Sequence, residues 1–200
     1  MFVSTALCCA IAVLAANSAT VVAAAARAGL EVPAPVAVPV LRVLEIACPD
    51  RYADLTLAQL LPTGVHGRQQ RFVPNAEQLH NARRIVDVVA RRGMPPYAAV
   101  VALATALQES TLRNLTVAVD YDSLGLFQQR PSAGWGTPEQ LIDPVYATEA
   151  FLAALEHKVP NYSSVPLWEA AQATQVSAFP VEYAKWQEQA AHLTLALLAE

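Results

Sequence analysis

Cysteine is scarce, and its placement excludes a fold built on disulfides. The chain of 200 residues has three cysteines, and Cys8 and Cys9 lie inside an uncharged amino-terminal stretch. If that stretch is removed, Cys48 has no partner for an internal disulfide. Glu45 makes the residues before Cys48 a poor lipidation signal. We therefore interpret Cys48 as a lone, buried thiol.

Charged side chains are also few. They make up 15% of the chain, and the formal net charge is -4. This charge balance gives no indication of a basic surface that could bind nucleic acid, so no nucleic-acid partner is expected. With 54% hydrophobic residues, the composition argues against disorder and favours a compact body plus an apolar segment.

Residues that could bind a metal ion form no recognisable motif. The histidines are scattered at four positions, His66, His80, His157 and His192. They match neither HExxH nor another metal-binding spacing, so we expect no metal ion. No cofactor is predicted, and the oligomeric state does not follow from the sequence.

The amino terminus is a long uncharged stretch, since the first charged side chain is Arg27. Such a run is typical of a signal peptide or of a membrane anchor. Small residues at 15–17 and 23–25 could be cleavage sites, which mildly favours removal. We therefore expect export to the cell envelope or the extracellular space, with residues 1–27 as signal peptide or anchor. Contact with a membrane is expected only through residues 1–26, if they are not cleaved.

Residues 28–73 are expected to be a linker and a poorly defined segment. Three prolines alternate with small apolar residues between positions 28 and 40, which is typical of an extended linker. Residues 43–46 could form a short strand, and residues 53–61 a short helix that Pro62 and Gly64 would end.

A helical pattern begins at Asn75 and continues toward the carboxyl terminus. Asn75 and Gln78 predict a capping box, and Gly93 with two prolines would end the first helix. A second helix should start near Pro96, and further helices are indicated at 137–140, 143–155, 166–175 and from Pro180 onward. The first helix should bury Leu79, Ala82, Val86 and Val89, and the last one Tyr183, Trp186, Leu193 and Leu197. Residues 74–200 are therefore expected to form an all-α domain.

Glu109 is notable because it ends a helix that is otherwise uncharged back to Tyr97. The negative end of the helix dipole and burial beside Leu107 and Leu112 would both favour a protonated carboxyl group. Glycoside cleavage needs such a neutral acid, because the leaving sugar oxygen must receive a proton. From position alone, a solvated Glu109 paired with Arg113 is the simpler interpretation.

A segment downstream carries residue types that suit sugars. Residues 123–131 read SLGLFQQRP, in which a glycine permits a tight backbone and amides adjoin an aromatic ring. Glu109-Ser110 is followed, sixteen residues after the glutamate, by Gly-Leu-Phe-Gln starting at Gly125. This combination resembles the goose-type lysozyme and soluble lytic transglycosylase superfamily.

A closer resemblance is to the exported lysozyme-like domains of actinobacteria. Their motifs ALQES, DSLGLFQQRPSxGWGTP and AAQxxQxSAFPxxYA occur here at residues 106–110, 122–138 and 170–184. The resemblance implies a lysozyme-like helical fold with a glycan cleft, and it makes Glu109 the general acid. The implied substrate is the peptidoglycan glycan strand, cleaved between muramic acid and glucosamine.

The same resemblance assigns roles to individual residues. Ser110 would support the acid, Gly125 and Gln128 would line the cleft, and Tyr183 matches a late tyrosine of the family. Residue type and position add further candidates for substrate contact, which are Asp122, Ser123, Phe127, Gln129, Trp135 and Gln175. The indole of Trp135 could equally be a cleft wall or a core residue.

Two stretches depart from the transglycosylase pattern. The family's Ala-Tyr-Asn element is Ala-Thr-Gln here, at residues 173–175, and residues 116–119 read TVAV where more polar residues are usual. Hydrolysis would also need a second carboxylate, and only Asp120 and Asp122 lie between Glu109 and Gly125. Either could hold a water, although both suit turns. A lytic transglycosylase needs a single glutamate.

These observations lead to competing functions. The first is an exported glycosidase that cleaves peptidoglycan, either a lytic transglycosylase or a muramidase. The alternative is a non-catalytic module that binds the cell wall or assists envelope assembly, which the altered 173–175 element and the acidic net charge favour. A third is an interaction protein tethered to the membrane by its apolar terminus.

Overall fold

The computed structural model of the protein describes residues 52–177 and 179–199. These residues belong to one compact unit, Ala47–Glu200. The expected export segment, the linker at 28–40, the short strand at 43–46 and Cys48 lie outside the described residues. No helix within 52–177 and 179–199 is long and apolar enough to cross a membrane.

Helix α2, Ala76–Arg91, begins with the predicted capping box. The Asn75 side chain accepts a hydrogen bond from the backbone of Gln78, whose side chain in turn accepts one from the backbone of Asn75. Leu79 does not join the core, because it is 40% exposed. The inward positions of this turn belong instead to Gln78 and Asn81, whose amides bond to carbonyls behind them.

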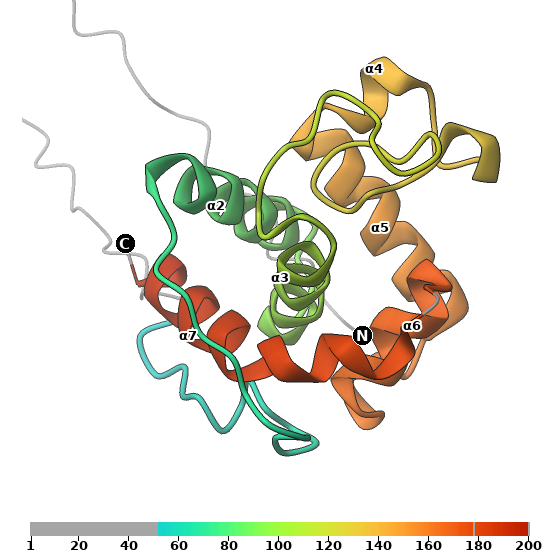
Figure 1. The fold of residues 1–200 in the computed structure, drawn as a ribbon. Helices are drawn as coiled ribbons and strands as arrows, with labels where there is room; N and C mark the ends of the chain where they lie inside the picture. The colour runs from blue at the N-terminus through green and yellow to red at the C-terminus, as the bar shows by residue number, and fades with distance from the viewer. Residues whose placement is uncertain (1–51, 178, 200) are drawn as a thin grey trace, which may run out of the picture. The chain divides into compact units, whose positions relative to one another are not determined.

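Helix α3, Pro96–Ser110, is the centre of the domain. It is buried on nearly all sides, with only Pro96, Gln108 and Glu109 outside the buried set. It packs against α2, α5 (Pro144–Lys158), α6 (Leu167–Gln175), η4 (Pro180–Trp186) and α7 (Gln187–Leu198). Figure 1 shows α3 between α2 and α7 on one side and α5 and α6 on the other.

The predicted helices of the second half are present. Short helix α4, Pro138–Leu141, starts with a capping box at Thr137, and α5 starts after the side-chain cap of Asp143. Two short 3-10 segments, η2 at Pro131–Ala133 and η3 at Tyr162–Ser164, connect the longer elements. The last helix does not run unbroken from Pro180, because residues 180–186 form the 3-10 helix η4 before α7 begins.

The described residues contain no strand. Two isolated bridges join Leu115 to Gly125 and Leu124 to Gln129, and they bend one loop into a compact turn. The all-α prediction is therefore confirmed for this part of the chain. The inward positions predicted for the last helix are also confirmed, since Tyr183, Trp186, Leu193 and Leu197 are all buried.

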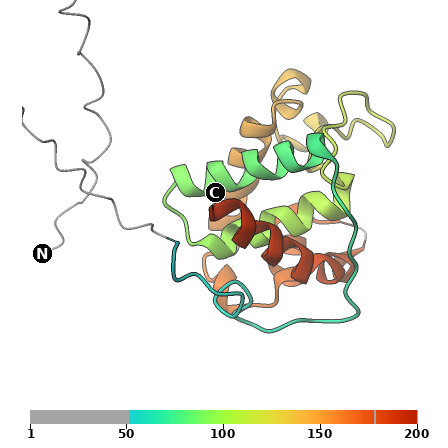
Figure 2. The same ribbon diagram turned by 90° about the vertical axis from the view of Figure 1, so that its left-hand side faces the viewer.

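Residues 52–73 lie against the helical body. The short helix predicted at 53–61 was wrong, because this stretch forms turns in which the Gln59 side chain accepts a hydrogen bond from the backbone of Thr56. Leu60 nevertheless reaches the core and is fully buried. Figure 2 shows the following residues as an extended chain that runs past α7 to the start of α2.

Candidate functional site

Glu109 occupies the penultimate position of α3, where its side chain is partly buried. Burial raises the pKa of its carboxyl group, and a hydrogen bond from Tyr183 partly opposes that rise. The Tyr183 hydroxyl donates to Glu109 Oε1 at 2.5 Å. Arg113, the simpler partner considered from the sequence, instead donates from Nε to the carbonyl of Ser110 at 3.3 Å. Burial thus favours the protonated form of Glu109 more than it would be favoured in a solvated glutamate.

Segment η4 supplies donors to two consecutive residues at the end of α3. Tyr183 bonds to Glu109, and Trp186 Nε1 donates to Gln108 Oε1 at 3.1 Å. Tyr183 is fully buried, and its pKa is raised by burial and then by the neighbouring Glu109 carboxylate. The phenol therefore stays protonated and remains a donor.

The chain turns sharply directly after the acid. Thr111 and Leu112 have φ values of 53° and 61°, both in the left-handed region. Non-glycine residues adopt this conformation at a cost, so the surroundings must hold it. The carbonyl of Thr111 accepts from Gln78 Nε2 at 2.8 Å, and that of Leu112 from Asn81 Nδ2 at 2.9 Å. Helix α2 thereby fixes the end of α3.

Gly125 belongs to the loop that is bonded to Ser110, the residue after Glu109. Its φ is +72°, and a Cβ atom at this position would lie 2.0 Å from the carbonyl oxygen of Leu141, so only glycine fits. Its amide donates to the carbonyl of Leu115 at 2.8 Å. Ser110 Oγ donates to the carbonyl of Leu126 at 2.8 Å, which ties the loop to α3.

The loop also brings together three further residues predicted from the sequence. Phe127 is fully buried and stacks on Phe151 with a centroid distance of 4.8 Å, so its ring belongs to the core. Gln175 Nε2 donates to the Phe127 carbonyl at 2.6 Å. Gln128 has a φ of 48° and folds its amide back onto the Gly125 carbonyl. The Gln175 bond connects the carboxyl end of α6 to the loop, and the Gln128 bond lies within the loop.

Ser123 and Gln129 serve the interior of the same loop. Both are buried. The Ser123 amide donates to the Asp120 carbonyl, and Gln129 Nε2 reaches the carbonyl of Ala147 at 3.4 Å. Their positions stabilise the turn rather than present a side chain to solvent.

Asp122 takes part in a separate network. Its Oδ1 accepts from Arg130 Nε at 2.6 Å and from Ser132 Oγ at 3.0 Å, while Oδ2 accepts from the Ser132 amide at 2.8 Å. The Arg130 hydrogen bond, followed by those from Ser132, lowers the pKa of this carboxyl group. Both oxygens are therefore occupied in holding the 130–132 segment.

Trp135 is partly buried, between the two alternatives that the sequence left open. Lys158 Nζ lies 5.5 Å from the centroid of its ring, a cation–π contact, and also donates to the Thr174 carbonyl at 2.9 Å. Tyr146 donates its hydroxyl to the Trp135 carbonyl at 3.3 Å. The Lys158 contact thus places the indole against the carboxyl end of α5, and the Tyr146 bond holds the Trp135 backbone to the same helix.

Glu109 does not line either of two hollows on the described surface. One of about 480 Å³ lies where residues 52–59 meet 93–96, and another of about 460 Å³ lies beside η4 and includes His66 and Trp168. Within residues 52–177 and 179–199, no cluster of three or more histidine, cysteine or acidic residues could hold a metal ion.

Comparison with known proteins adds no relative. No protein-family model matches the chain. No curated protein shows significant similarity to it.

Sequence reasoning missed several residues that build this site. Gln108 was passed over beside the acid, and Gln78 was interpreted only as a helix cap although its amide also reaches Thr111. A signal for Asn81 existed, because a polar residue at an inward helical position needs a buried partner. No comparable signal identified residues 64–72.

Proposed function

We propose that this protein is an exported peptidoglycan-cleaving glycosidase of lysozyme-like fold, with Glu109 as its general acid and base. The substrate is the glycan strand, and the bond cleaved joins muramic acid to glucosamine. The proposal rests on one arrangement above all: a partly buried carboxyl group with a raised pKa, at the end of a buried helix, held by a single phenol donor. The motifs that resemble the actinobacterial lysozyme-like domains supply the substrate class.

The chemistry follows from the protonation state of Glu109. The protonated carboxyl group donates its proton to the glycosidic oxygen as the bond to the leaving sugar breaks. The resulting carboxylate is stabilised by the Tyr183 hydroxyl, which donates to it. It then removes a proton from the hydroxyl of the same muramic acid, whose oxygen closes an anhydro ring and regenerates the acid.

The surroundings of Asp122 favour this transglycosylase route over hydrolysis. A hydrolase needs a second carboxylate with a free oxygen that can orient water or act as a nucleophile. Both oxygens of Asp122 already accept bonds from Arg130 and Ser132. Asp120 is exposed and contributes its carbonyl to the turn at Ser123. A single glutamate is sufficient for the intramolecular reaction.

Product analysis tests the proposal. Purified peptidoglycan is incubated with the full chain and, in parallel, with the Glu109→Gln variant, and the soluble products are identified by mass spectrometry. We expect anhydro-muropeptides from the unaltered protein only. Products with reducing ends would identify a muramidase instead and direct attention to Asp120 and Asp122.

The absence of products from a folded protein would contradict the catalytic proposal. A pull-down on insoluble peptidoglycan then decides the alternative. Binding that is unchanged by Glu109→Gln would identify a non-catalytic wall-binding module. Detection of the protein in the culture medium, with an amino terminus determined by mass spectrometry, tests whether residues 1–27 direct export and are removed.

A further inference from the structure

Residues 64–72, called the strap below, contact every residue of the junction between η4 and α7. The backbone amide of Gln70 donates to the Lys185 carbonyl at 2.7 Å, and the Phe72 amide donates to Gln189 Oε1 at 3.3 Å. The Gln187 side chain donates to the Gly64 carbonyl and accepts from the His66 amide. Together with Gln69, Arg71 and the Phe72 ring, these contacts cover residues 184–189 without a gap.

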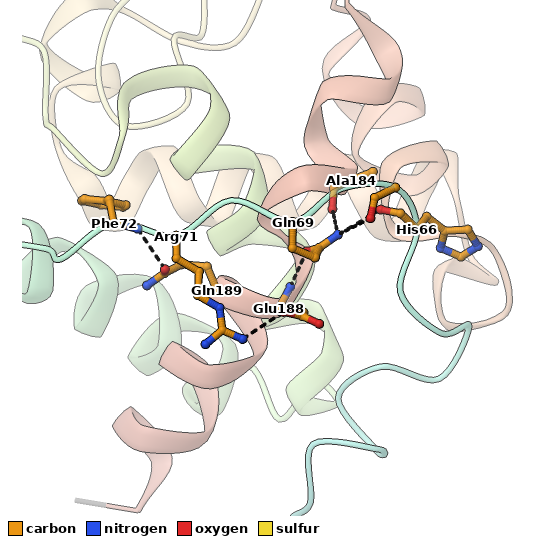
Figure 3. A network of polar contacts seen from close by, with 8 residues as sticks. His66, Gln69, Arg71, Phe72, Ala184, Glu188 and Gln189 are labelled. Atoms are coloured by element: carbon orange, nitrogen blue, oxygen red, sulfur yellow. Dashed lines mark hydrogen bonds and ion pairs between the residues drawn. The ribbon is translucent and has the colours of Figure 1, made fainter.

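Gln69 makes the central contacts of the strap (Figure 3). Its Nε2 donates to the Ala184 carbonyl at 2.9 Å, and its Oε1 accepts from the Glu188 amide at 2.9 Å. The second bond satisfies an amide in the first turn of α7, where the N-cap Trp186 provides no side-chain cap. One amide side chain therefore joins the end of η4 to the start of α7.

The strap is connected to the candidate acid through two short routes. Ala184, which bonds to Gln69, directly follows Tyr183, the donor to Glu109. Phe72 meets the Trp186 ring edge-on with centroids 6.0 Å apart, and Trp186 donates to Gln108. Tyr183 and Trp186 thus stand between the strap and two consecutive residues of α3.

We propose that the strap is a positioning element of the Glu109 site, and that Gln69 is its principal positioning residue. By fixing η4, it keeps the Tyr183 hydroxyl within hydrogen-bond distance of Glu109 and the Trp186 indole against Gln108. The inference rests on the proposed function, since it assigns to the strap the alignment of the same acid. Small displacements of such a group reduce rate, by roughly a hundredfold for about 1 Å.

A double-mutant cycle tests the proposal without depending on turnover. The pKa of the Glu109 carboxyl group is measured by carbon-13 NMR titration in the full chain and in Gln69→Ala, Tyr183→Phe and the double variant. Because the Tyr183 hydrogen bond lowers this pKa, each single variant should raise it. The double variant should raise it no further than Tyr183→Phe alone, since the strap acts through Tyr183.

A matched control lies in the strap itself. Arg71 pairs with Glu188 at 2.9 Å, but its side chain is 62% exposed, and exposed ion pairs contribute little. Arg71→Ala should leave the Glu109 pKa unchanged. If Gln69→Ala does not fold, Gln69→Glu replaces it, because a carboxylate still accepts from the Glu188 amide yet donates nothing to the Ala184 carbonyl.

The outcomes separate the strap from the proposed function. An unchanged Glu109 pKa in Gln69→Ala, or shifts that simply add in the double variant, would overturn the strap proposal even where the melting temperature falls. If the cycle behaves as expected and the protein releases anhydro-muropeptides, kcat/KM of Gln69→Ala should fall roughly ten- to a hundredfold. If the cycle holds while no product appears, the strap stands and the enzymatic proposal fails.

Discussion

The pKa values of the Glu109 and Asp122 carboxyl groups are shifted in opposite directions, by different physical effects. Glu109 is partly buried, accepts one hydrogen bond from a neutral phenol, and has a raised pKa. Asp122 accepts three hydrogen bonds, one of them from a guanidinium group, and has a lowered pKa. Burial dominates at the first site and donors dominate at the second, so the protonated form is favoured at Glu109 and the ionised form at Asp122.

The largest difference between the two sites should appear in turnover. Glu109→Gln should lower the rate of anhydro-muropeptide release by roughly a hundred- to ten-thousandfold, because the proton donor is removed. Asp122→Asn should retain most of the rate, since its oxygens already hold the 130–132 loop. Release is measured by mass spectrometry under saturating glycan. Comparable losses in both variants would indicate a carboxylate pair and a hydrolase.

The loop that is bonded to Ser110 should tolerate no side chain at Gly125. Gly125→Ala combines a left-handed residue with a Cβ atom 2.0 Å from the Leu141 carbonyl oxygen, so we expect a loss of about 2–5 kcal/mol in unfolding free energy. The measurement is urea denaturation. Gly134→Ala is the control, because Gly134 has a φ of +81° but no atom within 4 Å of the added Cβ. It should lose only about 1–2 kcal/mol. Equal losses would contradict the crowding at Gly125.

Removing the phenol donor, Tyr183, should widen the difference between the pKa of Glu109 and that of Asp122. In Tyr183→Phe, the loss of the hydrogen bond that lowers the Glu109 pKa should raise that pKa further. Cleavage begins with a protonated acid, so the alkaline limb of kcat/KM should move to higher pH. The pH profile of product release measures this shift. A profile unchanged from that of the unaltered protein would show that Tyr183 does not control the acid.

The smallest expected effect is an opposite pH dependence of stability at the two sites. The folded pKa of Glu109 is raised, so this group should destabilise the fold progressively as pH rises above its unfolded pKa. The folded pKa of Asp122 is lowered, so its contribution should be present above its unfolded pKa and lost as pH falls through the folded value.

Urea denaturation between about pH 3 and 7 tests both signs. For each variant, its unfolding free energy is subtracted from that of the unaltered protein. With rising pH, this difference should fall for Glu109→Gln and rise for Asp122→Asn. Salt should weaken only the second effect, because the Asp122–Arg130 pair is partly exposed. The same sign for both variants would contradict the assignment of opposite pKa shifts.

Local patterns made the helices predictable. The capping box at Asn75, the proline at the start of α3 and the caps before α4 and α5 depend on residues a few positions apart, so the sequence displays them directly. The 3-10 start of the last helix was not predictable from apolar spacing, since η4 and α7 present similar inward residues. Leu79 failed as a core residue because polar Gln78 and Asn81 take the inward positions.

The candidate site was predictable only in part. Glu109 and Tyr183 came from motifs, and the structure joins them by a hydrogen bond across 74 positions. Residue type alone did not predict the position of Phe127. Its aromatic ring could stack on a sugar, but it is fully buried against Phe151. The strap carries no periodicity or motif, and its contacts lie more than 110 positions away in sequence, for example 119 between Gln69 and Glu188. Such contacts depend on the whole fold.

The turn that ends α3 offers a way to recognise related chains. Gln78 and Asn81 bond to the carbonyls of Thr111 and Leu112, 33 and 31 positions later. A search pattern can therefore pair Gln-x-x-Asn near the start of one helix with Glu-Ser at the end of the next. Chains that keep both halves would share the geometry that stops the helix at the acid, even where the Gly-Leu-Phe-Gln loop has diverged.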